Sequence, residues 1–139
     1  MEWIEINSDE DIKELHNKYD NFEDSYIVNF SFESGNYVDD ERVGHEYNNN
    51  ILVVKFERLD DDPFCIEIRF EQTRRINCLF PVNGKDNWTS GIMFAKVVKN
   101  NDFYYWTIWK DFDPYNVEHM EFNDFFLIEA RTIKWRVLE

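Results

Sequence analysis

The sequence predicts an α+β fold, mainly an antiparallel curved β-sheet or half-barrel, with one N-terminal helix. The apolar period changes from 3.6 to two after Asn21, and turn-forming residues separate the apolar runs that follow. Short connections of this kind favour antiparallel pairing of neighbouring strands. At 139 residues, of which 18% are aromatic, the chain is expected to form a single domain, 1–139, with its own core.

The helix is predicted over roughly residues 8–20. Ser8 is a suitable N-cap, and the three acidic residues after it suit the positive end of a helix. Asp11 stands where a capping box usually carries Glu or Gln. One apolar face is expected to contain Ile12, Leu15, His16 and Tyr19.

The first long strand follows the helix, and its alternation predicts one buried face made of Tyr26, Val28, Phe30 and Phe32. Further strands are expected at 51–59, 64–70, 75–80, 91–98 and 103–109. Residues 72–74 either continue one long bent strand or separate two. The last segment, 125–137, is read as a strand rather than a helix, with a bend or bulge near Ala130 where the alternating residues become charged.

The chain is strongly acidic, with a formal net charge of −14 and a pI near 4.5. Nucleic acid and anionic membranes would repel such a protein, whereas a basic protein would be attracted. Residues 1–48 contain fourteen acidic and three basic residues, a formal charge of −11. The acidic residues are therefore concentrated on the helix, on the flanks of the first strand and in the polar stretch after it. An acidic composition can also serve solubility alone.

No membrane or export segment is expected, because no apolar run approaches the roughly 20 residues of a membrane helix. The N-terminus lacks the basic and apolar regions of a signal peptide, so a cytoplasmic location is expected. Cys65 and Cys78 would then be reduced thiols, either of which could be exposed. We expect both to be inert, although Arg69 shares a strand face with Cys65.

No residue pattern specifies catalysis or a metal. The histidines His16, His45 and His119 have no metal-binding spacing, and Glu118 and Glu121 beside His119 are expected to form a solvated loop. The run Asp60-Asp61-Asp62-Pro63 lacks the alternating acids of a calcium loop and is interpreted as a hairpin turn. Tyr104, Tyr105, Trp106 and Trp109 could form a platform on which a base or sugar stacks, but no basic track accompanies them, so nucleic acid is not expected to bind there. We therefore expect no cofactor, no metal and no catalytic residue.

Two segments, YDNFEDSYIVNFSFESGNYVD (19–39) and FLIEARTIKWRVL (126–138), resemble a family of small, largely uncharacterised bacterial cytosolic proteins. Members show a Phe-His-Asp-Ser core, a Ser-Gly-x-Tyr-Val turn and a closing Ala-x-x-Ile-Lys-Trp-Arg strand, and some are suggested to be immunity proteins for secreted toxins. Glu23 stands where the family has His. The matching residues are Asp24, Ser25, Ser34, Gly35, Tyr37, Val38, Ala130, Ile133, Lys134, Trp135 and Arg136.

The sequence thus predicts a non-catalytic acidic binding protein, an immunity protein that neutralises a basic toxin. The residues expected to bind the partner are Glu33, Asp39, Asp40, Glu41 and Glu46. Structural roles are expected for Asp24, Ser25, Gly35, Tyr37 and Trp135. The alternatives are a housekeeping or scaffold protein, and a small hydrolase that uses a pair of carboxylates.

Overall fold

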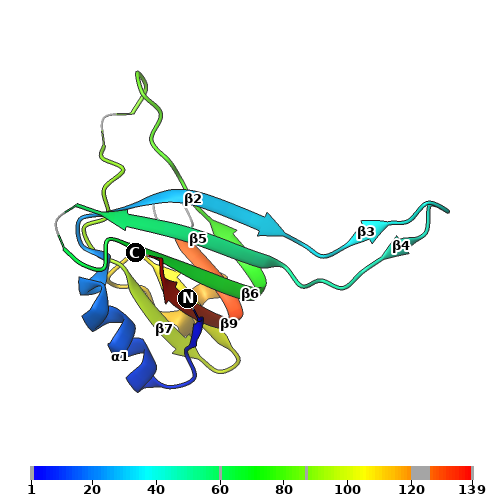
Figure 1. Cartoon of the computed structure of the whole chain (residues 1–139), viewed down its shortest axis with the longest axis horizontal. Coiled ribbons are helices and arrows are strands. Elements are labelled where there is room, and N and C mark those ends of the chain that lie inside the picture. Colours follow the sequence, from blue (N-terminus) through cyan, green and yellow to red (C-terminus); the bar gives the residue numbers. More distant parts are fainter. Residues whose placement is uncertain (1, 60, 87, 120–125, 139) are drawn as a thin grey trace.

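One open, curved antiparallel sheet forms the body of the protein in this computed structural model, which describes residues 2–59, 61–86, 88–119 and 126–138. The strand order is β2-β5-β6-β9-β8-β7, and β1 pairs with β9. Figure 1 shows α1 beside the sheet and the strands β3 and β4 on a projection far from it. The elements are β1 (Ile4–Glu5), α1 (Asp9–Lys18), η1 (Asp20–Phe22), β2 (Ser25–Glu33), β3 (Tyr37–Val38), β4 (Gly44–His45), β5 (Ile51–Arg58), β6 (Cys65–Asn77), β7 (Lys96–Asn100), β8 (Phe103–Thr107), η2 (Pro114–His119) and β9 (Leu127–Val137). The predicted fold class, with one helix and an open rather than closed sheet, is confirmed.

The helix α1 begins where its cap was predicted. The Ser8 hydroxyl accepts a hydrogen bond from the Asp11 N–H at 3.3 Å, and the Asp11 carboxylate accepts one from the Asn7 N–H at 2.8 Å. Two backbone donors at the start of the helix are thereby satisfied. On its inner face Leu15 is fully buried, so the helix is fixed to the sheet by the expected apolar side.

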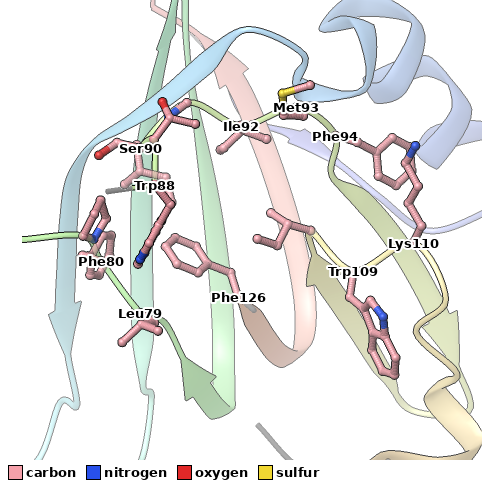
Figure 2. Close-up of a pocket in the computed structure, with 15 residues that line it drawn as sticks. Leu79, Phe80, Trp88, Ser90, Ile92, Met93, Phe94, Trp109, Lys110 and Phe126 are labelled. Carbon is pink, nitrogen blue, oxygen red and sulfur yellow. The ribbon is translucent and has the colours of Figure 1, made fainter. Parts of the chain in front are cut away.

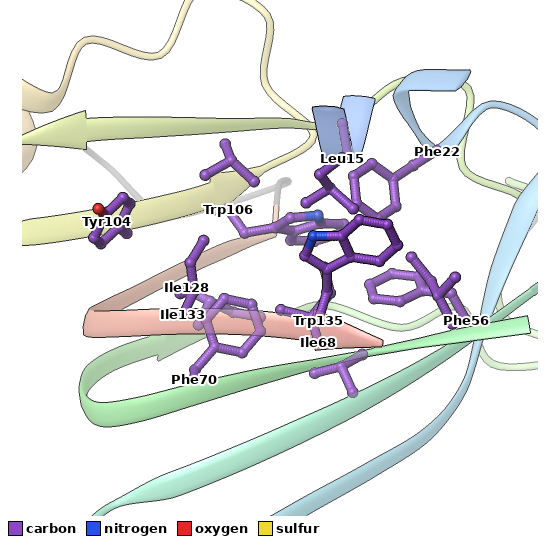
Figure 3. Close-up of a cluster of buried hydrophobic side chains, with 14 of the residues drawn as sticks. Leu15, Phe22, Phe56, Ile68, Phe70, Tyr104, Trp106, Ile128, Ile133 and Trp135 are labelled. Carbon is purple, nitrogen blue, oxygen red and sulfur yellow. The ribbon is translucent and has the colours of Figure 1, made fainter. Parts of the chain in front are cut away.

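The core is an aromatic and aliphatic cluster between the helical segment and the sheet (Figure 3). Phe22, in the turn after α1, is its hub, with ring centroids 5.1 Å from Phe56 and 5.7 Å from Trp106. Trp135 is 4% exposed and belongs to the same cluster. Burying rings of this size supplies much of the apolar stabilisation of a small domain.

The buried face predicted for β2 is confirmed only at Phe30, and a β-bulge changes the parity of the strand before that residue. The register with β5 shifts next to Val28. Ile27 and Phe30 pack against the core, whereas Tyr26, Val28 and Phe32 are exposed. One additional residue in a strand turns every later side chain to the other face, and simple alternation does not reveal it.

One long bent strand, β6, spans the doubtful residues 72–74. Its pairing with β9 shifts between Thr73 and Arg75, opposite Ala130 and Glu129, so the irregularity expected near Ala130 lies on the partner strand. Because a bulge brings consecutive residues to one side, Arg74 and Arg75 both reach the buried Glu129 carboxylate, at 3.1 and 3.3 Å. The predicted separate strand at 75–80 is therefore the end of β6.

The segment 91–95 lies outside the sheet, in contrast to the predicted strand at 91–98. Ile92 accepts a hydrogen bond from the Asp24 N–H at 2.9 Å and donates one to the Ser25 carbonyl at 2.8 Å. The Ala95 N–H binds the Asn21 carbonyl at 2.9 Å. These bonds hold the segment against the start of β2, and β7 begins only at Lys96.

The aromatic residues of β8 are buried on both faces. Trp106 enters the main core, while Tyr105 packs with Phe112, Val117 and Leu127 in a second cluster. Cover for the outward face thus comes from the segment around η2. Burial and the nearby Glu129 carboxylate raise the pKa of Tyr105, so its hydroxyl stays protonated and donates to Glu129 at 2.7 Å.

Candidate functional site

The most distinctive surface feature is a projecting β-hairpin, residues 34–50, which we call the arm. It joins β2 to β5 and extends along the longest dimension of the molecule (Figure 1). β3 and β4 pair with each other in a two-stranded sheet separate from the main one. The arm therefore needs its own local interactions to keep its shape.

The base of the arm is closed by a glycine and several asparagines. Gly35 has a φ of +81°, and a Cβ there would approach Asn49 Nδ2 at 2.6 Å, so this position requires glycine. The Asn36 carboxamide oxygen accepts hydrogen bonds from the N–H groups of Tyr47 and Asn48, each at 2.8 Å. These contacts hold the two chains of the arm in register, and the sequence analysis assigned no role to the asparagines.

The tip of the arm is organised by Asp39. One carboxylate oxygen accepts hydrogen bonds from the N–H groups of Glu41 at 2.9 Å and Val43 at 3.0 Å, and the other contacts His45 Nε2 at 2.8 Å. The hydrogen bond from His45, together with those backbone N–H groups, lowers the pKa of Asp39. Asp39, predicted as a partner-binding acid, thus also forms the turn.

An aromatic stack covers one face of the arm. Tyr37 lies between His45 and Tyr47, with ring centroids 4.7 and 6.2 Å away and interplanar angles of 10° and 15°. Tyr37 is 52% exposed and Tyr47 is 61% exposed. Val38 and Val43 are more than half exposed as well. Exposed large apolar side chains gathered on one element are typical of a contact site.

The arm and its base also carry exposed carboxylates. Asp40, Glu41 and Glu46 are exposed on the arm, and Glu33 is exposed at the end of β2 where the arm begins. Arg42 is the one basic residue within 34–50. The structure thus brings all five predicted partner-binding acids onto or beside one element, although four of them lie on the surface and Asp39 is partly enclosed.

The residues predicted to be structural occupy different environments. The Ser25 hydroxyl is fully buried and donates to the Phe22 carbonyl at 2.6 Å. Asp24 is exposed and binds Ile92 through its backbone N–H. Trp135 lies in the core, Gly35 at the base of the arm, and Tyr37 on the surface of the arm in the stack.

The histidines lie apart in the structure. His16 Nε2 accepts a hydrogen bond from the Val97 N–H at 3.0 Å, and burial lowers the pKa of His16. His45 belongs to the arm, and the side chains of His119 and Glu118, together with all of Glu121, lie outside the described residues. Within the described part of the chain, no three His, Cys, Asp or Glu side chains gather as a metal site would require.

The cysteines are largely withdrawn from solvent. Cys65 is 3% exposed, and its backbone is paired with β5 and accepts a hydrogen bond from the Leu138 N–H. Burial raises its pKa and raises the pKa of the half-buried Cys78 to about 12. Neither thiol has the lowered pKa of a nucleophile.

The acidic turn between β5 and β6 is organised by Arg58, which the sequence analysis overlooked. Its buried guanidinium donates to the carbonyls of Asp62 at 2.7 Å and Pro63 at 2.9 Å, and to the Asp20 carboxylate at 2.7 Å. Asp61 and Asp62 are exposed, and Asp60 lies outside the described residues. The sequence signal that could have indicated this role is a single arginine at the end of an apolar strand, directly before several turn-forming residues.

Comparison with protein-family models, curated proteins and solved structures gave no match. Among the helices that the structure describes, none has the length and apolar character needed to cross a membrane.

Proposed function

We propose that this protein is a non-catalytic binding protein that uses the arm to neutralise a basic protein partner, as an immunity protein neutralises a toxin. The observation that carries the proposal is a stack of aromatic rings, together with exposed carboxylates, on an element that projects from the sheet. The body of the protein supplies a rigid support for it. The net charge of −14 opposes nucleic acid and anionic membranes as partners.

The chemistry of the arm suits a surface rich in arginine and lysine. Exposed acids such as Glu41 and Glu46 can pair with guanidinium and ammonium groups, and the Tyr37 and Tyr47 rings offer faces on which a guanidinium can stack. Tyrosine and arginine are also the residues that most often dominate interface energies. A projecting hairpin with these groups fits the concave, basic substrate site of a toxin.

The shape of the arm is fixed before binding. Asp39 holds the tip and Asn36 holds the base, while Tyr37 stacks on both of its aromatic neighbours. An element already in its bound conformation loses less entropy when it associates. Local order in an exposed, acidic hairpin therefore supports a role in recognition, because solubility alone requires only charge.

The test is the association kinetics with a toxin encoded beside the gene for this chain, measured by stopped-flow at several salt concentrations. Association should slow as salt rises, because the Debye length falls to about 10 Å at 0.1 M. The arm variant should reverse three exposed acids and leave Asp39 in place, since Asp39 forms the turn. The arm variant is Asp40→Lys, Glu41→Lys and Glu46→Lys, and the matched control, with the same charge change on the body, is Glu2→Lys, Glu14→Lys and Asp102→Lys.

The arm variant should associate at least about tenfold more slowly than the control variant, with both remaining folded. Replacing Tyr47 by Ser should mainly speed dissociation, because the ring acts after contact is made. Equal effects of the two triple variants would show that the acid acts only through the net charge. Loss of toxin neutralisation without any change in binding would point to a different mechanism.

A further inference from the structure

An apolar pocket of about 460 Å³ lies away from the arm, between the segment that joins β6 to β7 and the residues that follow β8 (Figure 2). Trp88 and Phe94 come from the first segment, Trp109 follows β8, and Phe126 precedes β9. The volume lies within the roughly 300–1,000 Å³ typical of small-molecule sites. Its walls are therefore suited to a ligand of small size.

The pocket has a buried floor and an exposed apolar rim. Ile92 is 7% exposed, whereas Phe80, Trp88 and Trp109 are 48%, 43% and 38% exposed. In Figure 2 the Trp88 and Phe126 rings lie close together on one side, and Phe94 lies near Lys110 on the other. Large rings left half in water at the mouth of a pocket gain free energy when another apolar group covers them.

The charge of the lining is opposite to the charge of the chain. Although 29 of the 139 residues are acidic, none of the described lining residues is. Lys110 is the charged residue there, and Thr89 and Ser90 add hydroxyl groups. The Lys110 ammonium lies 5.2 Å from the centroid of the Phe94 ring and forms no ion pair with a described acid.

The Lys96 side chain holds the backbone at Lys110 in place. Lys96, the first residue of β7, donates through Nζ to the Lys110 carbonyl at 2.6 Å and lies 3.4 Å from the Phe112 carbonyl. The Lys110 ammonium is thus carried on a positioned segment at the edge of an aromatic pocket. A carboxylate placed there would meet a cation, whereas a cationic head group would find no counter-charge among the described lining residues.

We propose that this pocket binds an apolar molecule that carries one anionic group, of the class of medium-chain carboxylates, with its chain among the rings and its carboxylate at Lys110. The site is independent of the arm and of the function proposed for it. Discrimination by charge is the distinguishing feature, since the net charge of −14 would by itself favour a cationic amphiphile.

Isothermal titration calorimetry of the full chain tests the proposal, with dodecanoate and dodecylammonium below their micelle concentrations and dodecanol below its solubility limit. Dodecanoate should bind about tenfold more tightly than dodecanol, and dodecylammonium should bind most weakly. Lys110→Gln should weaken dodecanoate about tenfold and leave dodecanol unchanged. Lys13→Gln, which removes an exposed cation on α1, should change neither, and Trp88→Ala should weaken both.

Binding of dodecanoate that Lys13→Gln and Lys110→Gln weaken equally would overturn the assignment of the anion to Lys110. The absence of dodecanoate binding, or equal affinity for the three probes, would overturn the proposal as a whole. Circular dichroism confirms that each variant is folded, and the comparison of the two lysine variants stands even if Trp88→Ala fails to fold.

Discussion

The buried carboxylate of Glu129 is predicted to be a major local source of stability. It accepts the Tyr105 hydroxyl at 2.7 Å and contacts Arg74 Nε and Arg75 Nε at 3.1 and 3.3 Å. Its side chain is fully buried, whereas the Arg74 and Arg75 side chains are 50% and 27% exposed. The perturbation is Glu129→Ala, compared with Glu129→Gln and with Tyr105→Phe.

The cost of each change follows from what is left behind. Glu129→Ala leaves the buried Tyr105 hydroxyl without its acceptor, about 1–3 kcal/mol, and opens a cavity. The arginines add little more, because water can reach both of them. We therefore expect about 3–4 kcal/mol for Glu129→Ala and about 1–2 kcal/mol for Glu129→Gln, which keeps an oxygen acceptor.

Urea unfolding followed by tryptophan fluorescence measures these differences, with a double-mutant cycle between positions 129 and 105. Tyr105→Phe should cost about 1–2 kcal/mol in the native background and much less beside Glu129→Ala, giving a coupling energy of about 1 kcal/mol. The reasoning would be refuted if Glu129→Ala cost under about 1 kcal/mol with an unchanged m-value. It would also be refuted if Tyr105→Phe cost the same in both backgrounds.

Three further predictions concern pH, the arm and the thiols. Burial lowers the pKa of His16 below 6.5, so the unfolded chain takes up a proton at a higher pH than the folded protein does, and the free energy of unfolding should fall as the pH drops below about 6.5. His16→Gln should therefore flatten the dependence of the free energy of unfolding on pH between about pH 7 and pH 5, as measured with urea. An unchanged slope would count against this. Gly35→Ala should destabilise the arm by about 1–2 kcal/mol and speed amide exchange there, whereas Gly44→Ala, at a position with open space, should do neither. Equal amide exchange rates in the two variants would contradict the requirement for glycine at position 35. Because burial raises the pKa of both Cys65 and Cys78, iodoacetamide should modify the native protein slowly at pH 8 and the urea-unfolded chain rapidly, as mass spectrometry would show; rapid native labelling would disprove it.

The sequence was sufficient for the fold class because local signals repeat along the chain. The Ser8 cap and the change of apolar period located the helix, and turn residues separated the strands. The parity of β2 was not predictable, because the bulge next to Val28 depends on pairing with β5. Likewise, residues 91–95 have strand-like composition, but their hydrogen bonds go to Asp24, Ser25 and Asn21. In both cases the conformation depends on residues that are distant in the sequence.

The acidic charge of the candidate site was predictable from the sequence, but the arrangement of its side chains was not. The acids near Asp39 are visible in the sequence, but the turn that brings Tyr37 opposite His45 requires knowledge of the hairpin register. Asp39 was interpreted as a surface charge because a side chain that binds backbone N–H groups looks the same in sequence as one that faces a partner. The pocket at Lys110 is formed by segments far apart in the chain, so no local pattern indicates it.

The separate pairing of β3 with β4 has a consequence for how this protein can change over generations. The tip of the arm contributes no residue to either core cluster, so substitutions at exposed positions such as Asp40 and Glu41 leave the packing of the sheet unaltered. Surface changes of this kind usually cost within about 0.5 kcal/mol. Gene copies could thus diverge at the tip while they retain Asp39, Gly35 and the Asn36 clamp, and a single scaffold could present a different hairpin surface in each lineage.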